Sequence, residues 1–195
     1  MKLKTLFVLA GMFTGIICKG QNKSSIPAIN EERKRLESNG MLVLGSWAVG
    51  NIVWGGIGAS RTTGARKGFH QMNMYWNTVN LAIAGLGYFN ARRHQENKGL
   101  WESLEAQHKT EKILLFNAAL DLGYMAGGLY LKERGRRQQK NQLIGFGNAV
   151  MLQGAFLFVF DGMLYALQVK NKANFKPWMD KLSIHANGLS YKIKI

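Results

Sequence analysis

Residues 38–60 read SNGMLVLGSWAVGNIVWGGIGAS and contain no Asp, Glu, Lys or Arg. Three further stretches have the same character and cover residues 68–91, 113–131 and 141–169. Only two carboxylates, Asp121 and Asp161, interrupt the four stretches. A hydrocarbon core of about 30 Å needs about 20 apolar residues in a helix, whereas soluble amphipathic helices carry charges along one face. The sequence therefore predicts four membrane-spanning helices.

The connections predict how these helices are arranged. Short polar turns follow the first and third stretches, whereas residues 92–112 form a longer charged connection with a helical pattern. Short connections make neighbouring helices antiparallel. We therefore predict an all-α membrane protein with four transmembrane helices as two tandem helical hairpins, over residues 40–169. Residues 21–39 are expected to form a linker and a charged juxtamembrane helix.

The N-terminus has the pattern of a secretory signal peptide over residues 1–20. Two lysines precede an apolar run that ends at Ile17, and the small residues Cys18 and Gly20 suit cleavage before Gln21. Lipidation of Cys18 is the alternative, although Ile17 is bulky for the position before a lipidated cysteine. Cleavage removes the single cysteine of the chain, which excludes disulfide and thiolate chemistry.

Residues 170–195 differ in kind from the rest of the chain. Apolar and polar residues alternate on both sides of Asn187 and Gly188. Asn-Gly between alternating runs is a strong signal for a two-residue hairpin turn. We predict a short C-terminal β-hairpin in this tail. Because an isolated hairpin is only marginally stable, it is expected to pack on the bundle ends, the membrane surface or a partner.

Basic residues in the short turns predict the orientation. Residues 61–67 hold three positive charges and no negative one, and residues 132–140 hold five positive charges and one negative. The positive-inside rule places both turns in the cytoplasm and both mature termini outside it. The six lysines of the tail, against Asp180 alone, argue in the opposite direction.

The chain also matches itself at an offset of 71 residues. Residues 29–91 and 100–162 share 13 identities over 63 ungapped positions. Shared membrane composition is the alternative explanation for these matches. Duplication is favoured because Gly64 matches Gly135 in a turn, and not only within the apolar stretches.

The net charge of +15 raises the question of nucleic-acid binding. The Lys and Arg residues lie at the ends of apolar stretches, not on one face of a domain. Charge in that position orients helices and faces lipid headgroups, so the expected partner is the lipid bilayer and nucleic acid is excluded. A membrane or periplasmic protein partner and a homo-oligomer are both compatible with this pattern.

Polar side chains within the apolar stretches are the candidate site. A carboxylate inside a span costs at least ~2.5–3.5 kcal/mol and usually pairs or lines a cavity. Counting ~1.5 Å per residue puts Asp121 and Asp161 at one depth, ~12 Å from the outer edge. The pair can share a proton, bind a cation or hold a polar ligand, or each acid is simply neutral or hydrogen-bonded to its neighbours. The candidate ligand or ion residues are Asp121, Asp161, Asn117, Tyr124, Asn77 and Asn80.

Catalytic and metal motifs are not evident. The four histidines lie in or next to connecting segments, and no GxSxG, P-loop or CxxC motif occurs. We therefore expect no enzyme, no cofactor and no metal site. The main functional hypothesis is a non-enzymatic interaction or accessory subunit, and the alternative is a small solute, ion or proton carrier that uses Asp121 and Asp161.

A family resemblance supports the helical interpretation. The run from Gly40 to Ala48, the Gly55-Gly56 pair and the segment Phe69-His70-Gln71-Met72-Asn73 resemble an uncharacterised family of small bacterial four-helix integral membrane proteins. The resemblance covers most of residues 31–165. It implies four helices and residence in a membrane, with the bacterial inner membrane as the expected location, and it implies no activity.

Overall fold

The computed structural model describes residues 25–93, 98–180, 182–185 and 188–191. The predicted signal peptide lies outside the described residues. The elements are α2 (Ile26–Arg61), α3 (Gly64–Arg92), α4 (Leu100–Arg137), α5 (Asn141–Lys172), the 3-10 helix η2 (Ala173–Phe175), α6 (Lys176–Met179), β1 (Leu182–His185) and β2 (Gly188–Tyr191).

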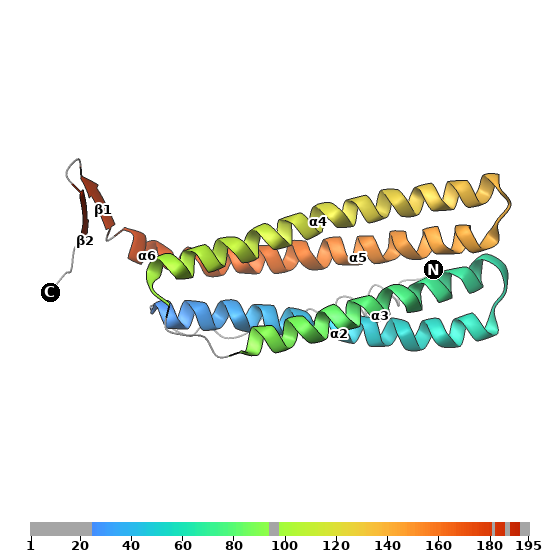
Figure 1. The fold of residues 1–195 in the computed structure, drawn as a ribbon, viewed down its shortest axis with the longest axis horizontal. Helices are drawn as coiled ribbons and strands as arrows, with labels where there is room; N and C mark the ends of the chain where they lie inside the picture. The colour runs from blue at the N-terminus through green and yellow to red at the C-terminus, as the bar shows by residue number, and fades with distance from the viewer. Residues whose placement is uncertain (1–24, 94–97, 181, 186–187, 192–195) are drawn as a thin grey trace.

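The four long helices form two helical hairpins, as the sequence predicts. Helix α2 packs along α3, α4 packs along α5, and α3 and α5 join the two hairpins. Both tight turns lie at the same end of the bundle, and α6 lies at the other end (Figure 1). The helices are long: α2 has 36 residues and α4 has 38, or about 54 and 57 Å at 1.5 Å per residue.

The predicted juxtamembrane helix is not a separate element. It is the first part of α2, which begins where the Ser25 hydroxyl accepts a hydrogen bond from the Ala28 amide at 3.3 Å, with Pro27 in the first turn. The charged connection before the third apolar stretch is likewise continuous with α4 from Leu100 onward. The bundle therefore extends well beyond the apolar stretches at the end opposite the tight turns.

Length and hydropathy support three of the four predicted spans. Among the described residues, three helices are long and apolar enough to cross a membrane: Ile26–Arg61, Leu100–Arg137 and Asn141–Met179. Helix α3 does not reach that hydropathy. Its sequence includes Asn73, Asn77 and Asn80, which are polar although all three are buried in the bundle.

The C-terminal part of the fold-class prediction needs correction, because the bundle that the described residues form is all-helical and a C-terminal β-hairpin is not seen as part of it. Within the described residues, the short segments β1 and β2 pair with each other, antiparallel, with Leu182 opposite Tyr191. The turn that should join them, residues 186–187, lies outside the described residues.

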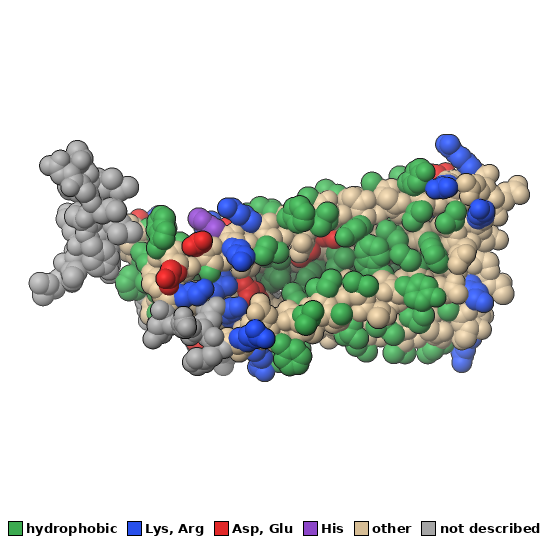
Figure 2. Space-filling model, in the orientation of Figure 1, with side chains coloured by type: hydrophobic (Ala, Val, Ile, Leu, Met, Phe, Trp, Pro, Cys, Tyr) green, Lys and Arg blue, Asp and Glu red, His purple; other side chains and the backbone are tan. Residues whose placement is uncertain are grey.

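The polarity of the bundle is inverted relative to that of a water-soluble protein. Buried side chains include Asn51, Asn73, Gln153 and Asp161, while large apolar side chains are exposed on every long helix. These exposed side chains include Val53 and Trp54 on α2, Leu86 and Phe89 on α3, Leu115 and Phe116 on α4, and Val159 and Met163 on α5. Figure 2 shows apolar side chains over the middle of the molecule, with Lys and Arg gathered towards its two ends.

Glycines let α4 and α5 approach closely. A Cβ at Gly128 would lie 2.8 Å from the Gly147 carbonyl oxygen, and a Cβ at Gly154 would lie 2.9 Å from the Asp121 carbonyl oxygen. Gly68 allows the contact of α3 with α5 in the same way, since a Cβ there would lie 2.8 Å from the Gln142 carbonyl oxygen. Small residues at helix crossings are typical of bundles that gain stability from close backbone packing.

The proposed internal repeat is not symmetric at the turns. Gly64 begins α3 with a positive φ of 59°, a conformation that suits glycine, whereas Gly135 lies inside α4. The turn match that favours duplication therefore joins two different structural positions. The repeat stays a prediction that rests on the matches within the helices.

The glycine contacts can be tested with adjacent residues. Gly128→Ala should lower the free energy of unfolding by about 1–3 kcal/mol, because the added methyl group meets the α5 backbone. Gly127→Ala is the matched control, since nothing lies within 4 Å of a Cβ there. It should be neutral or stabilising by up to about 1 kcal/mol. Unfolding of the purified protein in detergent, followed by circular dichroism, measures both; equal effects would contradict the packing.

Candidate functional site

A closed set of hydrogen bonds ties α2, α3 and α5 together. The Trp47 indole donates to Gln153 Oε1 at 2.9 Å, and the Gln153 amide donates to Asn73 Oδ1. The Asn73 amide donates to Asn51 Oδ1 at 2.7 Å. The Asn51 amide donates to the Trp47 carbonyl oxygen at 2.8 Å and so closes the set. We call these four residues the amide circuit. Because each polar group finds a partner, the circuit can be buried at little cost.

The stripe of asparagines on α3 continues beyond the amide circuit. The Asn77 amide donates to the Asn73 carbonyl oxygen at 2.8 Å, so Asn77 supports the circuit from its own helix. It is fully buried and does not line a cavity among those described. Asn80, one turn further on, is 4% exposed and faces a cavity between the helices. The structure thus separates these two predicted site residues.

The cavity has a volume of about 320 Å³ and is lined by residues from all four long helices. Five of the six predicted site residues lie in its wall: Asp121, Asp161, Asn117, Tyr124 and Asn80. The carboxyl groups of Asp121 and Asp161 are neighbours close enough to influence each other electrostatically, and the Asn117 amide lies beside Asp161. Two buried carboxyl groups side by side repel each other when both are ionised, so a shared proton or a bound cation stabilises this arrangement.

Two buried polar atoms in this wall have no hydrogen-bond partner among the described residues. They are Nδ2 of Asn80, a donor, and Oδ2 of Asp121, an acceptor. Both side chains are more than nine-tenths buried. Unsatisfied buried polar groups are rare in native proteins and commonly mark a place for water, an ion or a ligand.

The cavity opens sideways between α3 and α4. Val79 and Ile83 on α3, and Leu120 and Tyr124 on α4, all line the cavity and are themselves exposed. Figure 2 shows a hollow on this face near the middle of the molecule. Tyr124 meets Trp76 edge to face, with ring centroids 4.9 Å apart. Aromatic rings and carboxyl groups are thus available to the same ligand.

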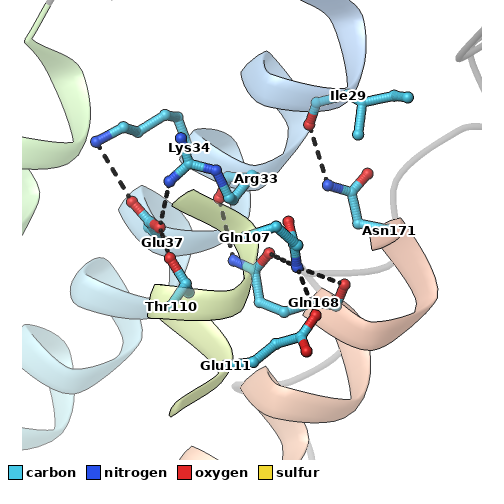
Figure 3. A network of polar contacts seen from close by, with 9 residues as sticks. All are labelled: Ile29, Arg33, Lys34, Glu37, Gln107, Thr110, Glu111, Gln168 and Asn171. Carbon is cyan, nitrogen blue, oxygen red and sulfur yellow. Dashed lines mark hydrogen bonds and ion pairs between the residues drawn. The ribbon is translucent and has the colours of Figure 1, made fainter. Parts of the chain in front are cut away.

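A second polar network, which the sequence analysis missed, lies at the end opposite the tight turns (Figure 3). The Gln107 amide donates to the Gln168 carbonyl oxygen at 2.8 Å and to Glu111 Oε1 at 3.2 Å. The Gln168 amide donates to the Arg33 carbonyl oxygen at 3.1 Å, and the Asn171 amide donates to a carbonyl oxygen of α2 at 3.0 Å.

Direct contacts between α2 and α4 complete this network. The Thr110 hydroxyl donates to Glu37 at 2.8 Å, and the Asn30 amide donates to the Ser103 hydroxyl at 2.6 Å. The network therefore fixes the polar ends of α2, α4 and α5 against one another. The signal that could have revealed it is Gln and Asn at helical spacing within otherwise charged segments.

Metal ligation is not indicated by the side chains that the structure places. Within the described residues, no group of three or more His, Cys, Asp and Glu side chains is arranged to hold a metal ion. Asp121 and Asp161 are two carboxyl groups with an amide beside them. That set suits a proton, a monovalent cation or a hydrogen-bonding ligand better than a divalent metal.

Fold and site together define a helical bundle that buries amide and carboxyl groups and exposes apolar side chains. Residues 43–162, more than half of the chain, match the family of unknown function DUF6992, and the chain belongs to this family. This confirms the resemblance to an uncharacterised four-helix family. No curated protein and no solved structure matches the chain.

The amide circuit can be tested by a double-mutant cycle. Gln153→Leu should cost about 1–3 kcal/mol for each partner left unpaired, the Trp47 indole and Asn73 Oδ1. Trp47→Phe keeps a ring against Phe156, on which Trp47 stacks at 3.9 Å. The two changes together should show a coupling energy of about 0.5–3 kcal/mol in denaturant unfolding. Additive effects would show that the two side chains do not depend on each other.

Proposed function

We propose that the protein is an integral membrane protein in which α3 crosses the bilayer together with the three more apolar helices. Support comes from the direction in which the polar residues of α3 point. Its asparagines face the bundle, while Val79, Leu86 and Phe89 on its outer face are 61–75% exposed. Lipid meets the outer face of a helix, so the mean hydropathy of α3 understates its compatibility with a bilayer.

The proposed orientation has the tight turns in the cytoplasm and the opposite end outside, in a bacterial inner membrane. The support is the excess of Lys and Arg at the turns, since short cytoplasmic loops carry positive charge. The polar network of α2, α4 and α5 then lies in the external headgroup region and the water beyond it.

The proposed molecular function is binding of a small cationic solute at Asp121 and Asp161, as a small carrier binds its cargo. The single observation that carries it is the cavity wall in which the Asn80 donor and the Asp121 acceptor have no partner. A ligand with a positive group and a hydrogen-bonding atom satisfies both. An enzymatic role is not part of this proposal.

The charge of the pair limits the ligand. One proton shared between two carboxyl groups leaves one negative charge. A monovalent cation such as an alkylammonium ion neutralises it, and the ring of Trp76 in the same wall adds cation–π attraction. The lateral opening between α3 and α4 admits a solute with apolar groups. An accessory role with a protein partner stays a prediction of the sequence.

The span of α3 can be tested with introduced cysteines. A membrane-impermeant maleimide should not label Val79→Cys in intact vesicles, because lipid covers that position. Thr63→Cys and Arg93→Cys, at the two ends of α3, should be labelled from opposite sides. The parent chain, with Cys18 alone, gives the background. Labelling of Val79→Cys as fast as at the ends would mean that α3 does not cross the bilayer.

The carboxyl pair can be tested with simple ammonium ions. Methylammonium and tetramethylammonium should change the tryptophan fluorescence of the reconstituted protein, with Trp76→Phe removing the signal. Asp121→Asn and Asp161→Asn should each weaken binding roughly 10- to 100-fold, the loss of a charged hydrogen bond. Glu133→Gln, an exposed acid at a tight turn, is the control. Unchanged affinity in both aspartate variants rules out this function.

A further inference from the structure

A second cavity of about 620 Å³ lies on the outside of the bundle, where the first part of α4 passes the end of α5 and α6. It shares no wall residue with the cavity of Asp121 and Asp161. Trp101, Lys109 and Lys112 line it from α4, Lys172 lines it from α5, and Met179 lines it from α6. Figure 2 shows basic side chains and a histidine over this part of α4.

Helical spacing brings the α4 residues onto one face. Trp101, Glu105, Lys109 and Lys112 follow one another at intervals of three or four residues. Side chains at that spacing lie above one another along a helix. They form a strip about 17 Å long at 1.5 Å per residue, with the indole at one end and Lys112 at the other.

The cavity has an excess of positive charge in a defined position. Neither Lys109 nor Lys112 makes an ion pair with another described residue. Lys172 is held by Glu111, with Nζ 2.9 Å from Oε2, and Glu111 is itself held by the Gln107 amide. Glu105 is the one acid among the described wall residues. An anion entering the cavity therefore meets two ammonium groups that have no other partner.

Apolar side chains line the same cavity at both ends of the strip. Trp101 is 77% exposed, and Ile113 and Met179 are each 50% exposed. Lys112 is the last charged residue before the apolar stretch that starts at Ile113. The cavity thus spans the change from a charged to an apolar surface, which is where tryptophan and lysine meet the headgroups of a bilayer.

We propose that this cavity binds an anionic phospholipid, with the headgroup phosphate between Lys109 and Lys112 and an acyl chain running past Ile113. The inference rests on the membrane embedding proposed above and is independent of the carboxyl pair. Basic pockets at helix surfaces next to the headgroup region are suited to anionic lipids. Free phosphate makes no use of the apolar side of the cavity, whereas a phospholipid uses both sides.

The experiment uses the full chain reconstituted in vesicles of phosphatidylcholine that contain increasing fractions of phosphatidylglycerol with brominated chains. Bromine quenches nearby indoles, so the lysine variants are compared in an Ile113→Trp background, where the difference from the protein without that change isolates the indole beside the acyl chain. Quenching should need several-fold less brominated phosphatidylglycerol than brominated phosphatidylcholine. Lys109→Gln with Lys112→Gln should raise the phosphatidylglycerol requirement roughly tenfold or more, from the loss of two headgroup-facing charges.

The matched control removes the same charge elsewhere. Lys67→Gln with Lys140→Gln, two exposed lysines at the tight turns, should keep the wild-type curve. Equal quenching by the two lipids, or no effect of the Lys109 and Lys112 changes, overturns the proposal. Relief of quenching by inorganic phosphate also overturns it, in favour of a free-phosphate site. Failure of the wild-type protein to float with vesicles overturns the embedding itself, which is a separate result.

Discussion

Buried amide groups that must hydrogen-bond to one another are the constraint on which the rest of this bundle depends. Asn51, Asn73 and Gln153 come from three different helices, and each satisfies the next. A net gain of only about 0.5–1.5 kcal/mol per hydrogen bond is modest, but an unpaired group costs more than a pair gains. The amide circuit therefore specifies how α2, α3 and α5 are placed, and the apolar side chains that a soluble bundle would bury are turned outward.

Helix α4 is held by different means, and this difference explains where the cavity lies. No residue of α4 belongs to the amide circuit. Gly128 brings it against α5 near the tight turns, and Gln107 and Thr110 fix it at the opposite end. Between these two attachments, α4 and α3 stay apart and expose Leu120 and Ile83 at the opening. The cavity thus lies where α4 packs along α5, at Gly154, but is not joined to α3 by the amide circuit.

The sequence was sufficient for the helices, their pairing and most of the site. Charge-free stretches locate helical segments because charge is excluded from apolar surroundings, and Asp121, Asp161 and Asn80 share a cavity because helical spacing places them inward. The continuity of α2 and α4 was not predicted, since a change from charged to apolar residues resembles a boundary although the backbone continues through it. Asn77 as a ligand residue stays a prediction, since its amide is bonded within α3 while its Oδ1 has no partner among the described residues. The polar network was missed because its partners, such as Gln107 and Gln168, are 61 residues apart.

The carboxyl pair links the proposed ligand to the stability of the bundle. Asp121 is 3% exposed and Asp161 is 6% exposed, so the negative charge that one shared proton leaves behind is poorly solvated. An uncompensated buried charge costs several kcal/mol, and a second proton or a bound cation removes that cost. A cation that binds the folded protein alone adds RT ln(1 + [L]/Kd) to its free energy of unfolding. In the proposed function, protons and cations compete for the same pair, and exchange of one for the other is the elementary step from which coupled transport is built.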